Sequence, residues 1–178
     1  MTAVSAPPGK PAMLKTEAYE AHPRSRSGFS AVLWIGLIAG TLDITDSLIF
    51  NALRGITPAM VFRYIASGLI GLSAAVHWGL AAVAMGVVLH YLIALAWAAI
   101  FFAASRKFAL LIRRPVISGL LYGLGVYLFM NLVLLPLSNV PNTRHAISLA
   151  SRINGVLAVV IFIGLTISLL VRRISKHA

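Results

Sequence analysis

Long apolar blocks separated by short polar or basic segments run along most of the chain. Four blocks, at about residues 30–53, 79–104, 115–137 and 151–171, reach the roughly 20 residues that cross a hydrocarbon core of about 30 Å. Continuous apolar runs of this length indicate membrane-spanning helices rather than strands. The pattern predicts an all-α fold, a polytopic membrane four-helix bundle formed as a single transmembrane domain over 29–178.

A shorter apolar segment, TPAMVFRYIASGLIGL at 57–72, separates the first two blocks. Thr57 followed by Pro58 is typical of a helix start, because a capping side chain precedes a proline in the first turn. A helix over this segment would be about 22 Å long, and Arg63 interrupts its apolar character. An interfacial helix, a re-entrant helix and a fifth span are the three alternatives.

The basic residues favour four spans over five. With four spans and a cytoplasmic N-terminus, eleven of the 15 Lys and Arg residues lie on the cytoplasmic side. A fifth span would move the middle loop and the C-terminus outside and reverse this bias, against the positive-inside rule. We therefore expect both termini in the cytoplasm and a non-spanning external helix at 57–72.

Composition supports a membrane protein and excludes several other classes. The chain has 178 residues, of which 60% are hydrophobic and 11% charged, against about 45–50% and about 25% in soluble domains. Its net charge of +11 comes from residues at the ends of apolar blocks, so nucleic acid is not expected as a partner. The absence of cysteine excludes disulfides and thiolate chemistry. Residues 1–28 are expected to form a disordered cytoplasmic tail rather than a cleaved signal peptide.

Asp43 and Asp46 place half of the chain's four acidic residues inside the first apolar block. An Asp in hydrocarbon costs about 2.5–3.5 kcal/mol on insertion scales. We therefore expect the two carboxyl groups to share a proton or to face a positive partner. His90 is the partner that best matches their depth, followed by Arg152 and Arg63.

Polar residues of all four predicted spans fall at nearly the same depth. Counted from the cytoplasmic end of each block, they lie about 18–25 Å along the helix axis: Tyr127, Asp43, His90, Asp46, Asn131 and Asn154. Small residues recur at every fourth position in three blocks: Gly36 and Gly40, Ala82 and Gly86, Gly119 and Gly123. Small residues allow close helix packing in lipid, so we expect these faces to meet and to bring the polar groups together inside the bundle.

Three functional classes fit this polar layer. The first is a cavity that binds or conducts a proton, a cation or a small solute; its candidate binding residues are Asp43, Asp46, His90, Asn131, Asn154, Tyr127 and Arg152. The second is a structural or accessory membrane subunit in which the same groups only specify helix packing. Conduction by four spans would require a homo-oligomer, and the GxxxG of Gly36 and Gly40 is one candidate interface.

An enzyme is the third class. No HExxH, GxSxG or glycine-rich phosphate loop is present, so the sequence assigns no catalytic residue. Two Asp side chains on one helix also suit intramembrane hydrolysis poorly, because that chemistry holds water between two carboxyl groups. A metal site of Asp43, Asp46 and His90 is a weak alternative, and neither a metal nor a cofactor is assigned.

Three stretches of sequence resemble known proteins: GLIAGTLDI at 36–44, VVLHYLIAL at 87–95 and RRPVISGLLYGLGVYLFMNLVLLPLS at 113–138. They resemble a group of small four-span bacterial inner-membrane proteins of unknown function. More loosely, WIGLIAG at 34–40 and GLLYG and LPLSNVP at 119–123 and 135–141 resemble parts of the YagU-like inner-membrane proteins, some of which are linked to acid tolerance. The resemblance implies a multi-pass protein of the bacterial inner (plasma) membrane with the lipid bilayer as its partner, and it implies no particular activity.

Overall fold

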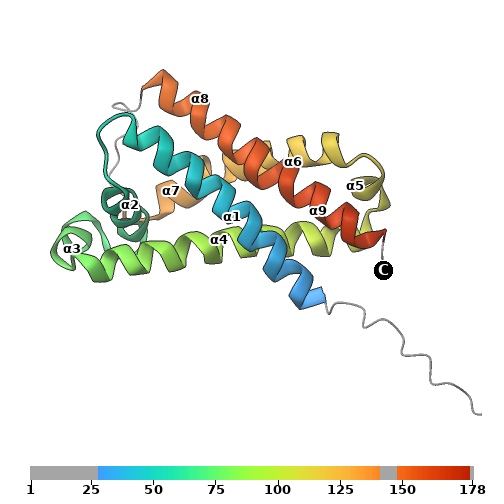
Figure 1. Cartoon of the computed structure of the whole chain (residues 1–178), viewed down its shortest axis with the longest axis horizontal. Coiled ribbons are helices and arrows are strands. Elements are labelled where there is room, and N and C mark those ends of the chain that lie inside the picture. Colours follow the sequence, from blue (N-terminus) through green and yellow to red (C-terminus); the bar gives the residue numbers. More distant parts are fainter. Residues whose placement is uncertain (1–27, 141–147, 177–178) are drawn as a thin grey trace, which may run out of the picture.

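The computed structural model describes residues 28–140 and 148–176, which are almost entirely helical and contain no strand (Figure 1). Four of the helices are long and apolar enough to cross a membrane. The prediction of an all-α four-helix membrane bundle is therefore confirmed, and the chain is an integral membrane protein. The predicted tail at 1–28 lies outside the described residues except for Gly28, which begins the first helix.

Two of the four spans are regular α-helices, α1 (Gly28–Ala52) and α4 (Leu80–Lys107). The third span, Pro115–Leu137, consists of α6 (Pro115–Phe129), the π-helix η1 (Met130–Leu134) and α7 (Leu135–Leu137). The fourth span, Leu149–Ser175, consists of α8 (Leu149–Ala158), the π-helix η2 (Val159–Leu165) and α9 (Thr166–Ser175). The predicted spans agree with these helices to within a few residues at each end.

The two π-helical segments have local causes. Pro136 follows η1, and a proline ring clashes with the carbonyl four residues earlier, so a wider turn before it relieves the clash. In the fourth span, Thr166 Oγ1 donates a hydrogen bond to the Ile161 carbonyl oxygen, five residues earlier, at 3.2 Å. The backbone N–H of Thr166 bonds to the same carbonyl, so two groups of Thr166 hold the wide turn of η2.

The spans run alternately in opposite directions (Figure 1). The starts of α1 and α6 lie with the ends of α4 and α9 at one end of the bundle, here called the basic end. The short helix α5 (Ala109–Arg113) joins α4 to α6 at this end. The opposite end, here called the α2 end, holds the end of α1 and the starts of α4 and α8. α1 packs against α4 and the fourth span, and α6 packs mainly against the fourth span.

α2 (Pro58–Ile70) is the short apolar helix that the sequence predicts after the first span. Its predicted start is confirmed, since the Thr57 side chain accepts a hydrogen bond from the Met60 backbone N–H at 3.4 Å. The helix ends because Gly71 has a φ of 80°, a left-handed conformation that favours glycine. At 13 residues, α2 is too short to span the membrane. α3 (Leu72–His77) then leads to α4.

α2 crosses α4 at Gly86, where the missing side chain allows the Phe62 backbone carbonyl to lie directly against the helix. Ala66, Ala75 and Ala82 form a small buried cluster beside this crossing. The small-residue face of α4 was predicted to meet the other spans, and for Ala82 and Gly86 this prediction is wrong. These two positions pack against α2, because a face of small residues permits close approach without specifying which helix approaches.

The remaining predicted small-residue contacts join spans to one another. A Cβ atom added at Gly36 would lie 2.9 Å from Leu95 Cα, and one added at Gly40 would lie 2.9 Å from Ala94 Cβ. α4 of the same chain therefore covers Gly36 and Gly40, which excludes this GxxxG as an interface between two copies of the protein. Gly119 and Gly123 make the equivalent close contact with η2.

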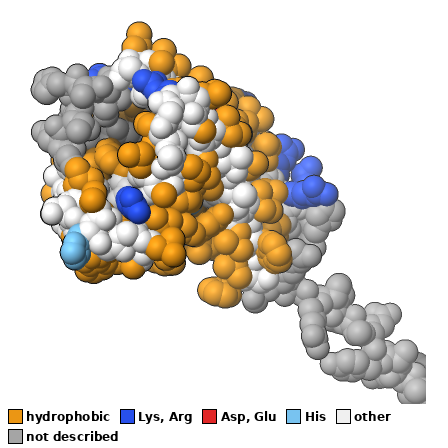
Figure 2. Space-filling view, turned by 60° about the vertical axis from the view of Figure 1, so that its left-hand side comes forward, with side chains coloured by type: hydrophobic (Ala, Val, Ile, Leu, Met, Phe, Trp, Pro, Cys, Tyr) orange, Lys and Arg blue, Asp and Glu red, His pale blue; other side chains and the backbone are white. Residues whose placement is uncertain are grey.

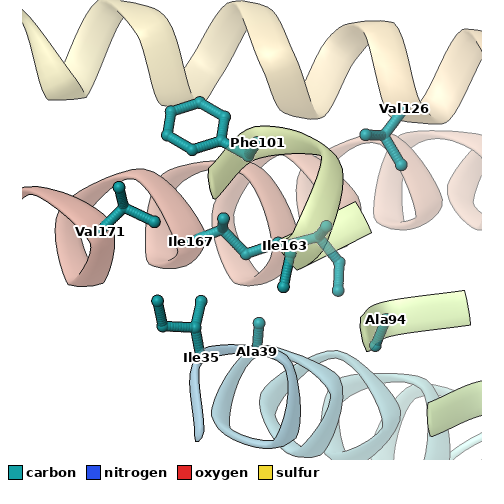
Figure 3. Packing of buried hydrophobic residues seen from close by; sticks show 9 residues of the cluster. Ile35, Ala39, Ala94, Phe101, Val126, Ile163, Ile167 and Val171 are labelled. Carbon is teal, nitrogen blue, oxygen red and sulfur yellow. The ribbon is translucent and has the colours of Figure 1, made fainter. Parts of the chain in front are cut away.

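The hydrophobic core lies between the middle of the bundle and the basic end, and Figure 3 shows how its side chains pack together. It consists of Ile35, Ala39, Ala94, Ala98, Phe101, Val126, Ile163, Ile167 and Val171. Among the described residues, α1 has no buried position after Ile44, the third span has none after Val126, and the fourth span has none before Ala158. The spans are therefore tightly packed in one half and more loosely packed in the half nearest the α2 end.

Candidate functional site

The polar layer predicted from the sequence lies where this core ends. Asp46 Oδ2 accepts a hydrogen bond from Asn154 Nδ2 at 2.9 Å, which joins α1 to α8 across 108 positions of sequence. Both side chains are half-buried. The structure thus brings together two polar residues of different spans that the sequence places at one depth.

His90 contacts the same region of α1 from α4. Its Nε2 atom lies 2.8 Å from the Gly40 carbonyl oxygen, and since a carbonyl oxygen can only accept, Nε2 carries the hydrogen. The neighbouring Tyr91 hydroxyl lies 3.1 Å from Thr41 Oγ1 and forms a second bond between the two helices. The side chain of His90 is thus held by a backbone carbonyl of α1. A backbone carbonyl was one of the two partners expected for this imidazole, and a carboxylate, which its depth favours, was the other.

Asp43 lies at the centre of this region. On α1 it falls between Ala39 and Gly40, within about 60° of each, and so on the face that packs inside the bundle. Its carboxylate is within electrostatic range of His90 and Asp46. The residues that the structure describes supply no hydrogen bond or ion pair to Asp43, and its oxygens are not sealed from the surroundings. The acceptor capacity of this half-buried carboxylate is therefore open to a water molecule, a proton or a cation.

Polar side chains continue from Asp43 toward the α2 end along two facing helices. On α1, Ser47 and Asn51 follow at intervals of four residues and so share its face, and both are half-buried. Ser148 caps the start of α8 by accepting a hydrogen bond from the Ser151 backbone N–H at 3.2 Å. Ser148 and Ser151 precede Asn154 at intervals of three, and their two hydroxyl oxygens lie 3.1 Å apart. We call these residues the polar track: Asp43, Asp46, Ser47 and Asn51 of α1 with Ser148, Ser151 and Asn154 at the start of the fourth span.

Arg54 lies beside the polar track at the α2 end. Its Nη2 atom donates a hydrogen bond to Ser148 Oγ at 3.0 Å, and its guanidinium lies 5.2 Å from the centre of the Phe50 ring. Asn51, Ser148 and Ser151 are site residues that were not predicted from the sequence. The spacing of Ser148, Ser151 and Asn154 in the first turns of an otherwise apolar span is the signal that would have identified this side of the track.

The other predicted site residues lie around the polar layer. Asn131 Nδ2 donates to the Tyr127 carbonyl oxygen of its own helix at 2.9 Å, and a Cβ atom added at Gly155 would lie 3.6 Å from the Tyr127 ring. Arg152 is exposed on α8. Arg63, the third expected partner of the carboxylates, donates instead to the Gly79 carbonyl oxygen at 3.3 Å, on the turn before α4.

The chemistry available at the site is that of oxygen ligands. Asp43 and Asp46 are the two acidic residues within 28–140 and 148–176, and Ser47, Asn51, Ser148, Ser151 and Asn154 of the polar track carry further side-chain oxygens. Over the same residues, no group of three His, Cys, Asp or Glu side chains is placed to hold one metal ion. A comparison of the chain with protein-family models, with curated proteins and with solved structures finds no match. The function is therefore inferred from the geometry of the site.

Proposed function

We propose that the protein binds a proton or a small cation at Asp43, and that this ion enters along the polar track from the α2 end. Two acidic groups with hydroxyl and amide oxygens attract cations and repel anions, and hard cations prefer oxygen ligands. The dense core between Asp43 and the basic end favours entry from one side. Passage to the other side would require these core residues to move apart.

The open Asp43 carboxylate is the observation that carries this proposal. Within a membrane, an ionisable group that only stabilises packing is expected to be paired with another group, whereas one that serves a pathway needs an unfilled coordination position. Asp46 and His90 each have a hydrogen-bond partner on another helix. Asp43 has no hydrogen-bond partner among the described residues. A substitution at Asp43 therefore distinguishes the binding function from the packing alternative.

The alternative is a structural or accessory subunit whose polar layer specifies packing alone. The Asp46–Asn154 and His90–Gly40 hydrogen bonds support it, because each joins two spans. Under this alternative Asp43→Asn would leave the properties of the protein almost unchanged. Under the binding function it removes the charge that holds the ion and leaves both interhelical bonds in place.

We further propose that the basic end and both termini face the cytoplasm of a bacterium, and that the α2 end faces outward from the inner membrane. The basic end carries seven of the Lys and Arg residues at 28–140 and 148–176, whereas the α2 end carries Arg54, Arg63 and Arg152. This asymmetry supports the orientation through the positive-inside rule. The resemblance to small bacterial inner-membrane proteins supports the same location.

The test is thermal unfolding of the full chain in detergent, followed by tryptophan fluorescence. The pH is varied first, and then LiCl, NaCl, KCl or CaCl2 replaces choline chloride at constant ionic strength. A ligand at 100 times its Kd stabilises by about 2.7 kcal/mol. We expect such a stabilisation, by acid or by one of these cations, in the wild type and in the control Tyr122→Phe, which removes a hydrogen bond outside the polar track, and its loss in Asp43→Asn.

Two results would overturn the binding function. One is an unresponsive wild type, which would leave the packing subunit as the explanation of the polar layer. The other is an equal response of Asp43→Asn and the wild type, which would place any bound ion elsewhere. Proteoliposomes loaded with a pH-sensitive dye then establish whether a bound proton also crosses the membrane under an imposed potential.

A further inference from the structure

A second charged region lies at the basic end, far from the polar track. Seven Lys and Arg side chains converge there from three segments, and we call them the basic cluster: Arg106 and Lys107 at the end of α4, Arg113 and Arg114 at the end of α5, and Arg172, Arg173 and Lys176 at the end of the fourth span. α5 packs against α4, α6 and α9, so the fold brings these three segments together. The ion-binding function proposed above does not use them.

The basic cluster has no carboxylate partner within the described part of the chain. The acidic residues at 28–140 and 148–176 are Asp43 and Asp46, and Asp43 lies 15 positions after Gly28, or about 22 Å along α1 from the basic end. A concentration of like charge opposes the compact state. An anionic partner from outside the described residues would reduce this repulsion.

Apolar side chains beside the basic cluster indicate where that anion lies. Phe108 and Leu110, at the start of α5, are 63% and 64% exposed, whereas Leu111 packs against the hydrophobic core. α5 thus presents two apolar side chains outward next to Arg113 and Arg114. A short helix with exposed apolar residues and adjacent basic residues fits the boundary between acyl chains and headgroups. Figure 2 shows that hydrophobic side chains dominate one face of the bundle and that no acidic side chain is visible on it.

We propose that the basic cluster binds the phosphodiester headgroup of an anionic phospholipid, with Arg113 and Arg114 contacting the phosphate and with Phe108 and Leu110 contacting the acyl chains. Arginine pairs with phosphate oxygens through two parallel hydrogen bonds, and basic pockets between spans bind lipid headgroups in this way. The helix α5, held against α9, keeps the two arginines beside the basic residues of the fourth span. The site is independent of Asp43, so either proposal can fail alone.

The experiment titrates the purified full chain in detergent with phosphatidylglycerol and, separately, with zwitterionic phosphatidylcholine, and follows the melting temperature. The variant Arg113→Gln/Arg114→Gln is compared with Arg54→Gln/Arg63→Gln, which removes the same charge at the α2 end. Each basic residue near an anionic lipid contributes about a fivefold change in affinity. We expect phosphatidylglycerol to stabilise the wild type, and the cluster variant to bind it roughly 30-fold more weakly.

Three outcomes contradict the lipid site. Phosphatidylcholine could stabilise the wild type as well as phosphatidylglycerol does, which would remove the role of headgroup charge. The two double variants could lose affinity equally, which would make the effect one of net charge. Inorganic phosphate at the same concentration could reproduce the stabilisation, which would identify a site for free phosphate. The melting temperature of each variant without lipid shows that it is folded.

Discussion

The contact between α6 and η2 allows a quantitative test of the fold. A Cβ atom added at Gly123 would lie 2.6 Å from Val160 Cα and 3.0 Å from the Val160 carbonyl oxygen. Non-bonded carbon atoms at their optimal separation are about 3.5–4.0 Å apart, so Gly123→Ala requires the two helices to separate by about 1 Å. Overpacking of this kind costs about 1–3 kcal/mol.

Gly125 provides the matched control for this substitution. It lies two residues further along α6, and nothing lies within 4 Å of a Cβ atom added there. Both Gly→Ala changes gain the same helix propensity, which is worth about 1 kcal/mol. The difference in the free energy of unfolding between the two variants therefore reports the contact between α6 and η2 alone. We expect Gly123→Ala to be less stable than Gly125→Ala by about 1–3 kcal/mol.

The assay is reversible unfolding in mixed micelles with increasing SDS, followed by tryptophan fluorescence, which yields the free energy of unfolding of each variant. Circular dichroism in the absence of SDS checks that both variants keep the helix content of the wild type. Equal stability of the two variants would refute the reasoning, because it would mean that α6 and η2 do not approach closely at Gly123 in the membrane protein.

Two further substitutions test other helix contacts. Tyr122→Phe removes the hydroxyl that donates to the Trp97 carbonyl oxygen at 2.6 Å. In the same SDS titration we expect the free energy of unfolding to fall by about 0.6 kcal/mol and at most by about 1.7 kcal/mol. An unchanged free energy of unfolding would contradict this hydrogen bond. Gly86→Ala places a methyl group against the Phe62 carbonyl. We expect faster amide hydrogen exchange in α2 and unchanged exchange in the hydrophobic core. Unchanged protection of the α2 amides would contradict the close crossing of α2 and α4.

The spans could be predicted because bilayer thickness imposes a minimum length on each apolar block. Their ends were less well defined, since a helix does not stop where the hydrocarbon stops. α4 continues to Lys107 and the fourth span to Ser175, so both carry their basic residues on the last helical turns. Hydropathy measures only the apolar part of such a helix, and the predicted ends fall short accordingly.

Depth along a helix could be predicted for the site, but the rotation and partner of each helix could not. The fixed rise per residue placed Asp46 and Asn154 at one level, and the two side chains are bonded. The same count placed His90 at that level, yet its hydrogen bond goes to the Gly40 carbonyl. Gly40 makes this possible because it lacks a side chain where α4 approaches, a consequence of pairwise packing that a depth count does not contain.

The position of the core explains why the polar track occupies one half of the bundle. Polar groups at Ser47, Asn51 and Ser151 replace apolar side chains that would otherwise fill the space between α1 and α8, so the spans bury little in this half. α2 restores some packing there by resting on Ala82 and Gly86 of α4, nearer the α2 end than the α4 residues of the core. A subunit whose polar groups served packing alone would have all of them paired between helices. The open carboxylate of Asp43, at the inner end of a track that α2 leaves polar, is instead the arrangement expected of a site that receives an ion.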